Sequence, residues 1–481
     1  MKRKGILLSI SSLPSPNGIG TFGKAGYSFC DFLARAKQNA WQILPLSVTS
    51  YGDSPYQSPS GYALNPYFID LDFLCRDGLL LESEYKTVDF GSGDTVDYGK
   101  LFLNRKDVLK KAVKRLKTSK EYDEFLSENE FWIEDYALFM TLKELNEYKE
   151  WSSWDEKYKN RDKKAIEKLK KEQKELIDFY KKEQFLAFSQ WKNLKNYANE
   201  KGIEIIGDMP IYSAYDSHDV WAEPSNYLLD DELKPKMVAG VPPDDFTADG
   251  QLWGNPLYNW DKMKADGFLW WKRKLTHQAK LYNTVRIDHF RGFEAFFAIP
   301  FGKKPKDGKW IKAPGEELFK FIKKEVDISI IAEDLGLITE EVRKLLRVCG
   351  FPNMRVLQFG FDGDLTHEYL PHNYPENCVA YTGTHDNAPT NAWLLECDER
   401  KREKVVDFAE SRVHPTFGLI KKLFLSKADR VIILMQDYLL QGADKRMNTP
   451  GKEMGNWTYR ITADVLENKA IIRTIRDLSN K

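Results

Sequence analysis

The stretch Val285-Arg286-Ile287-Asp288-His289 is a short apolar run that ends in charged and polar side chains. Short apolar runs of this kind recur along the chain, and each is followed by polar or small residues. The eight runs are Gly5–Ile10, Trp41–Leu46, Ile203–Gly207, Thr284–Ile287, Ile328–Ala332, Arg355–Phe359, Cys378–Tyr381 and Val431–Met435. Runs of this length without polar alternation predict strands that are buried on both faces, as in a parallel sheet.

Helix-like stretches separate these runs. They are Tyr27–Lys37, Phe268–Tyr282, Gly315–Glu325, Thr339–Leu346 and Lys401–Leu425. Alternation of strands and helices predicts an α/β fold, and eight strands predict a closed (β/α)₈ TIM barrel that takes in residues 1–481 as one catalytic unit. Only residues 436–481 follow the last run, so we expect no separate C-terminal β-domain.

Two gaps between the predicted strands are too long for simple crossovers. The first predicts an inserted, mostly helical subdomain at about residues 65–185, between the second and third strands. Its lysine-rich stretch, Lys157–Lys182, interleaves lysines with acidic residues, which is typical of a solvated helix face and not of a nucleic-acid patch. The second gap predicts a rim subdomain at about residues 212–265. Its segment 240–258 is rich in Gly, Pro and Asn, so we expect an irregular loop there that covers the substrate.

The composition limits the possible partners. The chain has 72 Lys+Arg and 72 Asp+Glu, so its formal net charge is zero. A neutral chain gains no field steering toward polyanions, which disfavours nucleic acid or an acidic membrane as a partner. No apolar run reaches the length of about 18 residues that a membrane span requires.

The N-terminus and the cysteines indicate the compartment. Met1-Lys2-Arg3-Lys4 and the apolar residues after it mimic a signal peptide, but the run is short and no small-x-small cleavage site follows. We therefore interpret it as the first buried strand.

The five cysteines are scattered without a C-x-x-C pair, as is typical of reduced thiols, and the predicted compartment is the cytoplasm.

Carboxylates follow four of the predicted strands. Asp208, Asp288, Glu333 and Asp386 each stand at the carboxyl end of a run, where the reacting groups of this fold gather. One acid at a strand end is as well explained by a salt bridge, but four acids on one rim would repel one another unless function required them.

The neighbours of these acids suggest different roles. Arg286 and Asp288 are two residues apart on a strand, so both point into the barrel, and the cation favours an ionised Asp288. Glu333 follows an apolar strand, where burial and nearby acids raise the pKa and suit the carboxyl to hold a proton. Such a pair, expected about 5–5.5 Å apart, is that of a retaining glycosidase, with Asp386 as a third acid that stabilises the transition state.

A metal-dependent barrel hydrolase is a rival interpretation, because it also gathers acids at strand ends. Such sites need several imidazoles, and of the seven histidines only His289 and His385 fall at strand ends. We therefore expect no metal and no cofactor. His289 itself has two open interpretations, as a donor to a backbone carbonyl or as a contact to substrate.

The residues at these strand ends resemble the motifs of a known family. Arg-Ile-Asp-His at 286–289, Ala-Glu-Asp-Leu-Gly at 332–336 and Thr-His-Asp-Asn at 384–387 stand in the order found in the α-amylase clan. Within that clan the chain is similar to the amylomaltases, or 4-α-glucanotransferases. Supporting segments are Ser12–Pro14, Gly18–Gly20, Ser54–Ser58, Gly207–Ile211, Gln251–Tyr258 and Arg446–Gly451.

The resemblance implies a role for each site residue. Asp288 would be the nucleophile, Glu333 the acid/base and Asp386 the transition-state stabiliser. The substrate-binding residues would be Tyr56, Asp208, Gln251, Trp253, Asn255, Arg286 and His385, with residues 251–256 arching over the glucan.

The implied reaction is a retaining double displacement. It would move segments of maltooligosaccharides or of starch- or glycogen-type α-1,4-glucans to the 4-hydroxyl of another glucan or of glucose. The alternatives are an α-glucan hydrolase of the same clan and a non-catalytic glucan-binding protein. The sequence predicts no oligomeric state.

Overall fold

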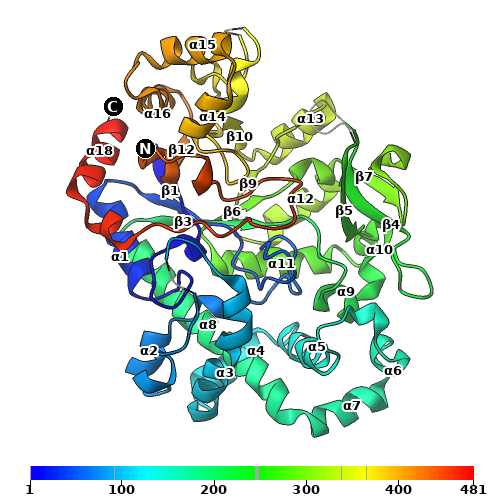
Figure 1. Ribbon diagram of the computed structural model, residues 1–481. Helices are drawn as coiled ribbons and strands as arrows, with labels where there is room; N and C mark the ends of the chain where they lie inside the picture. The colour runs from blue at the N-terminus through cyan, green and yellow to red at the C-terminus, as the bar shows by residue number, and fades with distance from the viewer. Residues whose placement is uncertain (1, 92, 244–248, 337, 365, 481) are drawn as a thin grey trace.

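The computed structural model describes residues 2–91, 93–243, 249–336, 338–364 and 366–480 (Figure 1). Its centre is a closed barrel of parallel strands in the order β1-β12-β11-β10-β9-β6-β3-β2. The strands are β1 (Arg3–Leu7), β2 (Ala40–Gln42), β3 (Glu204–Met209), β6 (Thr284–Ile287), β9 (Ser329–Ala332), β10 (Asn353–Val356), β11 (Cys378–Tyr381) and β12 (Arg430–Leu434). Each coincides with or overlaps one of the eight predicted runs, and the predicted TIM barrel is confirmed.

The N-terminal strand settles one ambiguity of the sequence. β1 pairs in parallel with β12 on one side and with β2 on the other, so it closes the barrel. The run that mimics a signal peptide is therefore a barrel strand in this structure. Within the described ranges, no helix is both long and apolar enough to cross a membrane.

Three of the predicted strands extend too far. The run Gly5–Ile10 leaves the ladder at Leu7. The run Trp41–Leu46 forms a ladder only over Ala40–Gln42, and the run Arg355–Phe359 leaves the ladder at Val356. Residues Leu357–Phe361 form a 3-10 helix instead, although most of their side chains stay buried. An apolar run reports burial, and burial continues where the chain turns out of the barrel, so the run cannot mark the end of a strand.

Helices surround the barrel. They include α1 (Lys24–Arg35), α8 (Lys174–Glu200), α11 (Leu269–Leu281), α12 (Gly315–Glu325), α13 (Glu340–Cys349), α15 (Glu399–Ala409), α16 (Pro415–Leu425) and α18 (Lys469–Ser479). The stretch Lys401–Leu425, predicted as one helical stretch, is two helices. Glu410 takes a left-handed φ of 52° and ends α15, and Pro415 begins α16.

The segment between β2 and β3 is helical. It contains α2 (Leu71–Arg76), α3 (Tyr98–Arg115), α4 (Lys120–Glu128), α5 (Ile133–Leu145), α6 (Glu156–Lys159) and α7 (Lys163–Glu172), which lie together at the bottom of Figure 1. α7 buries Ile166 and Leu169, while Lys168 and Lys170 pair with glutamates at its surface. The prediction of a solvated, ion-paired face is confirmed for this helix. α8, which follows it, packs against α1 and α11 of the barrel.

A small antiparallel sheet stands beside the barrel, in the order β5-β4-β7-β8. Its strands are β4 (Met237–Val241), β5 (Gln251–Pro256), β7 (Ala295–Pro300) and β8 (Lys309–Lys312). The expectation of an irregular loop over 240–258 is wrong at both ends of that segment, where β4 and β5 pair. Residues 244–248 lie outside the described residues.

The composition of the hairpin explains this error. A Cβ atom on Gly240 would lie 2.2 Å from the Gln251 carbonyl oxygen, so glycine is what allows the two strands to approach. Pro256 lies on the edge strand, where a missing N–H is tolerated. Strands β7 and β8, which complete the sheet, follow β6 in the sequence and were not identified from it.

Candidate active site

The predicted acids meet at one end of the barrel. Asp288, Glu333 and Asp386 line a cleft of about 370 Å³, together with the predicted residues Tyr56, Gln251, Trp253, Asn255 and His385. Two predicted residues do not line it. Asp208 and Arg286 are 2% and 3% exposed, and they lie beneath the cleft.

Arg286 ties three of these residues into one network. Its Nη1 donates to both Asp208 oxygens, at 2.8 and 2.7 Å, and its Nη2 donates to Asp288 Oδ1 at 2.9 Å. The prediction that Arg286 and Asp288 share a face is confirmed. Burial lowers the pKa of the Arg286 guanidinium, but the two carboxylates outweigh it and raise that pKa above its usual range. A permanent cation therefore fixes one oxygen of Asp288, and a third of the Asp288 side chain stays exposed to the cleft.

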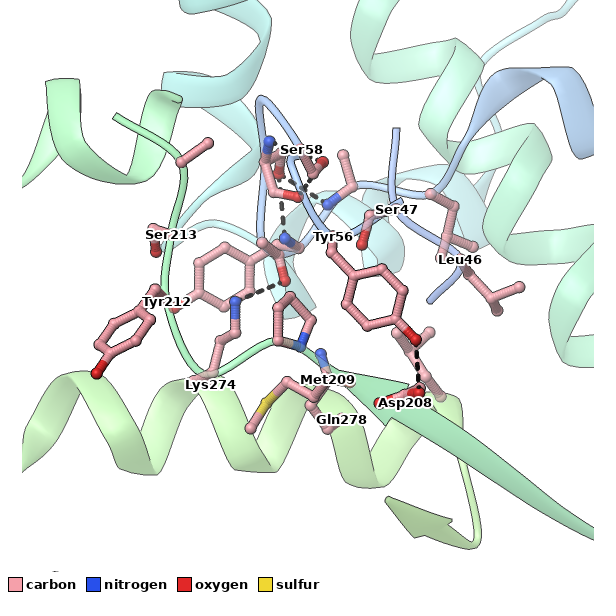
Figure 2. A pocket seen from close by; sticks show the side chains of 18 of the residues that line it. Leu46, Ser47, Tyr56, Ser58, Asp208, Met209, Tyr212, Ser213, Lys274 and Gln278 are labelled. Atoms are coloured by element: carbon pink, nitrogen blue, oxygen red, sulfur yellow. Dashed lines mark hydrogen bonds between the residues drawn. The ribbon is translucent and has the colours of Figure 1, made fainter. Parts of the chain in front are cut away.

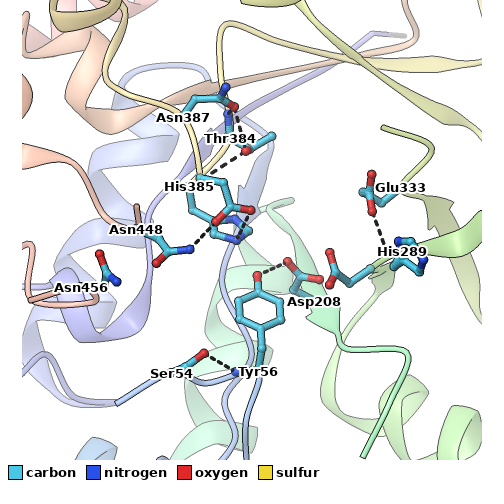
Figure 3. A network of polar contacts seen from close by, with 12 residues as sticks. Ser54, Tyr56, Asp208, His289, Glu333, Thr384, His385, Asn387, Asn448 and Asn456 are labelled. Carbon is cyan, nitrogen blue, oxygen red and sulfur yellow. Dashed lines mark hydrogen bonds and ion pairs between the residues drawn. The ribbon is translucent and has the colours of Figure 1, made fainter. Parts of the chain in front are cut away.

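Tyr56 joins this network from a different part of the chain. Its hydroxyl donates to Asp208 Oδ2 at 2.8 Å, as Figure 3 shows. Its ring stacks on the imidazole of His385, with centroids 5.3 Å apart and planes 15° apart. Tyr56 thus connects the Asp208–Arg286 pair to the Asp386 side of the cleft.

Glu333 is held by backbone groups. Its Oε2 accepts from the His289 N–H at 2.7 Å and its Oε1 accepts from the Leu335 N–H at 2.6 Å. Burial raises the pKa of the Glu333 carboxyl to about 8, against the attraction of Arg286 and with repulsion from Asp288 added. The predicted upward shift is confirmed, and at neutral pH this carboxyl holds a proton.

The turn after β6 supplies one of those donors. His289 has a left-handed φ of 50°, which is uncommon for a residue with a Cβ atom. Burial lowers the pKa of its imidazole to about 4, so the ring is neutral. Its Nε2 has no hydrogen-bond partner among the described residues, and the ring meets Trp253 edge to face at 4.8 Å. Of the two interpretations, donation from Nε2 to a backbone carbonyl is therefore not observed there.

Asp386 is held by a segment near the C-terminus. Asn448 Nδ2 donates to Asp386 Oδ1 at 2.6 Å, and the Asn448 N–H donates to the His385 carbonyl at 3.1 Å. Arg446 donates to the Asp386 carbonyl, and His385 Nε2 lies 3.3 Å from Asp386 Oδ2. The sequence pointed to this segment only through the resemblance of Arg446–Gly451, and assigned Asn448 no role.

A second residue that the sequence missed is Trp457. It lines the cleft, and its ring lies 5.7 Å from Tyr56 and 5.9 Å from His385. Its φ of 66° is left-handed, and its N–H donates to the Met447 carbonyl at 2.8 Å. Strained backbone of this kind is concentrated at functional sites, but no sequence pattern reveals it.

Strand β5 of the small sheet supplies three of the residues that line the cleft, Gln251, Trp253 and Asn255. Trp253 Nε1 donates to Gln251 Oε1 at 3.0 Å, so these two β5 side chains hold each other. Asn255 accepts from Gln57 Nε2 at 3.1 Å and donates to the Ser213 carbonyl at 3.0 Å. Strand β5 is thereby attached to the segment that carries Tyr56.

Comparison with known proteins gives a consistent answer. A family model described as 4-alpha-glucanotransferase matches residues 8–466. The 4-alpha-glucanotransferase of Clostridium butyricum is 46% identical over 96% of this chain and 97% of its own, and that of Streptococcus pneumoniae is 44% identical over 97% and 94%. Among solved structures, the amylomaltase from Streptococcus agalactiae in complex with acarbose is 40% identical, covers 100% of this chain and 99% of its own, and superposes with a TM-score of 0.97.

Proposed function

Because this chain belongs to the 4-alpha-glucanotransferase family and has the activity of that family, we propose that Asp288, Glu333 and Asp386 carry out the transfer by a retaining double displacement. The observation that carries this proposal is the pairing of two unlike acids in one cleft. Asp288 is fixed by a cation, while Glu333 is buried and holds a proton. Opposed environments of this kind assign the nucleophile and the acid.

In the first step Asp288 attacks the anomeric carbon of an α-1,4-linked glucose. The glycosidic bond breaks as Glu333 gives its proton to the departing 4-oxygen, and a glucosyl ester forms on Asp288. Asp386 accepts hydrogen bonds from the sugar hydroxyls and favours the oxocarbenium-like transition state. Asn448 and His385 hold it in place for this.

In the second step a glucan or glucose takes the vacated position. Glu333, now ionised, removes the proton from its 4-hydroxyl, and that oxygen attacks the ester with retention of configuration. Transfer exceeds hydrolysis when the acceptor is bound and water is kept from the ester. The rings of Trp253 and Tyr56, which both line the cleft, give that cover.

The substrates we propose are maltooligosaccharides and starch- or glycogen-type α-1,4-glucans, with glucose as the smallest acceptor. Family membership disfavours the hydrolase, metal-hydrolase and non-catalytic alternatives. We propose the cytoplasm as the compartment, which agrees with five unpaired cysteines, four of them buried.

The test separates the two acids. With α-maltosyl fluoride as donor, the leaving group needs no protonation, so Glu333→Gln should still form the ester and then stall without a general base. Intact-protein mass spectrometry should show a maltosyl adduct on Glu333→Gln and none on the matched variant Asp288→Asn/Glu333→Gln. An adduct on the double variant would refute the assignment of Asp288.

A product ladder tests transfer itself. Incubation with maltotriose should yield glucose together with oligomers longer than maltotriose. Glucose and maltose without longer products would mean hydrolysis.

A further inference from the structure

Tyr56 lies on a segment with little regular structure. Between β2 and α2, Ser47 and Leu64 form an isolated bridge, and a 3-10 turn spans Pro66–Phe68. The position of the Tyr56 ring must therefore be set by side-chain contacts to the rest of the molecule. The ring is held directly by Asp208 and His385, and the segment itself is held five residues further on, at Gly61.

Two charged side chains hold the backbone of Gly61. Its N–H donates to Asp219 Oδ2 at 2.7 Å, and its carbonyl accepts from Lys274 Nζ at 3.1 Å. A Cβ atom at this position would lie 2.0 Å from Lys274 Nζ and 2.9 Å from Asp219 Oδ1. Any side chain at this position would have to displace the Lys274 ammonium, and we call the three residues the Gly61 clamp.

The neighbours of Gly61 are held from the same two helices. The Pro59 carbonyl accepts from the His218 N–H at 2.9 Å, on α9 (His218–Ala222). The Tyr62 carbonyl lies 2.9 Å from Nε2 of His277, on α11. Burial lowers the pKa of His277 to about 3, so the ring is neutral and carries its proton on the nitrogen that faces this carbonyl.

These helices adjoin the strands that carry the partners of Tyr56. α9 follows β3, which holds Asp208, and α11 leads directly into β6, which holds Arg286. The clamp thus fixes an irregular segment to the same elements that support the network under Asp288.

The clamp is costly for the fold. Lys274 is 4% exposed and Asp219 is 3% exposed, and burial lowers the pKa of the Lys274 ammonium despite the nearby carboxylate. Within the described part of the chain, Asp219 Oδ1 has no hydrogen-bond partner. Two buried charged groups whose hydrogen bonds to Gly61 are made to neutral backbone atoms contribute little net stability compared with apolar residues of the same volume. The clamp therefore serves to fix the position of the Gly61 backbone more than to stabilise the fold.

A small cavity separates the clamp from the active site. It holds about 20 Å³, which is room for one water molecule, and Tyr56, Asp208, Gly61 and Lys274 are among its lining residues. Figure 2 shows Lys274 on one side of this space and the Tyr56–Asp208 hydrogen bond on the other. Both the clamp and Tyr56 therefore border the same small space, so a shift of Gly61 would be passed to the segment that carries the ring.

We propose that Lys274 and Asp219 are positioning residues of the transfer reaction, which act through Gly61 to hold the Tyr56 ring against His385 at the cleft. This inference rests on the role proposed for Tyr56.

The test is a double-mutant cycle between Lys274→Met and Tyr56→Ala. Methionine keeps the volume of the side chain and removes the ammonium. We expect Lys274→Met to lower kcat/KM for maltotriose about tenfold in the wild-type background and less than about twofold in the Tyr56→Ala background. The effects of two substitutions do not add when one residue acts through the other. The dissociation constant for acarbose should show the same coupling without turnover.

Lys143→Met is the matched control. Lys143 is also a buried lysine on a helix; it donates to the carbonyls of Tyr148 and Lys149 and pairs with Asp216, and none of these residues lines the cleft. It should leave kcat/KM unchanged in both backgrounds even if it lowers the melting temperature. If Lys274→Met does not fold, Asp219→Asn provides the same cycle, since it keeps an acceptor for the Gly61 N–H but removes the charge.

The outcomes separate the two proposals. Equal losses from Lys274→Met in both backgrounds would overturn the clamp and leave the proposed function intact. No loss in the wild-type background would do the same. Full activity of Tyr56→Ala alone would overturn the role of Tyr56, and the clamp with it.

Discussion

The two sides of the cleft are built differently. Asp288 and Glu333 come directly after β6 and β9, and they are held by a buried arginine and by backbone N–H groups. Asp386 follows β11, but its partner Asn448 lies on an irregular segment near the C-terminus. In Figure 3 Glu333 and His289 lie on one side, and His385 and Asn448 on the other.

This difference matches the proposed division of labour. The groups that make and break bonds stand on barrel strands, which hold them rigidly. The groups proposed to shape the sugar stand on segments outside the barrel strands, namely residues 446–457 next to Asp386 and the β4–β5 hairpin next to His289. We call Asp288, Glu333 and Arg286 the strand side, and residues 446–457 with the β4–β5 hairpin the segment side. Substitutions on the strand side should therefore act on the chemical step, and those on the segment side should act on substrate placement.

The largest effect is expected from Arg286→Met. It removes the cation that orients Asp288 and leaves the Asp208 carboxylate buried without its partner. We expect kcat/KM for maltotriose to fall about a thousandfold, because Asp288 loses the charge-assisted hydrogen bond that orients it and the carboxylates around the cleft lose their shared cation. Arg105→Met, at a fully buried arginine of α3, is the control. It should lower stability, measured by urea unfolding, and leave kcat/KM within about threefold of wild type. Comparable losses in kcat/KM for both would show that the Arg286 effect is only one of folding.

Asn448→Ala probes the segment side. It removes a hydrogen bond to a charged acceptor, worth about 1.5–3 kcal/mol, so kcat/KM should fall by about 10- to 100-fold. Asn146→Ala, at a residue whose amide donates to its own helix, is the control and should be silent. If Asn448→Ala acted as strongly as Arg286→Met, the two sides would not differ in the way described.

The sequence predicted the two sides unequally. Asp208, Asp288, Glu333 and Asp386 were found because parallel strands end at one edge of a barrel, whatever their separation in the chain. Asn448 and Trp457 were not found, because they lie on a segment without periodicity and their placement depends on contacts to distant residues. The β4–β5 hairpin was mistaken for a loop, since its Gly and Pro residues signal turns and its pairing is completed by β7 from another part of the chain.

The pH dependence of kcat/KM tests Glu333, on the strand side, and its expected effect is smaller than those of the two substitutions above. In the proposed mechanism Glu333 must hold its proton in the first step, and burial raises its pKa to about 8. Activity with maltotriose should therefore be lost as pH rises through about 8, with kcat/KM falling about tenfold per unit above it. With α-maltosyl fluoride, formation of the ester needs no proton from Glu333, so the rate of that step should show no such fall. A fall at the same pH with both donors would place the titrating group elsewhere.

The smallest effect is expected at the hairpin, where Trp253→Ala removes part of the cover over the cleft. The acids stay in place, so total cleavage of maltotriose should change little, while the share of hydrolysis should rise about threefold as water reaches the ester. The measurement is the ratio of reducing ends formed to oligomers longer than maltotriose. Trp310→Ala is the matched control, because Trp310 lies on β8 of the same sheet and packs on Phe297, away from the residues that line the cleft. An unchanged ratio in Trp253→Ala, or an equal rise in Trp310→Ala, would mean that the hairpin only supports the wall of the cleft and that exclusion of water depends on the Tyr56 side.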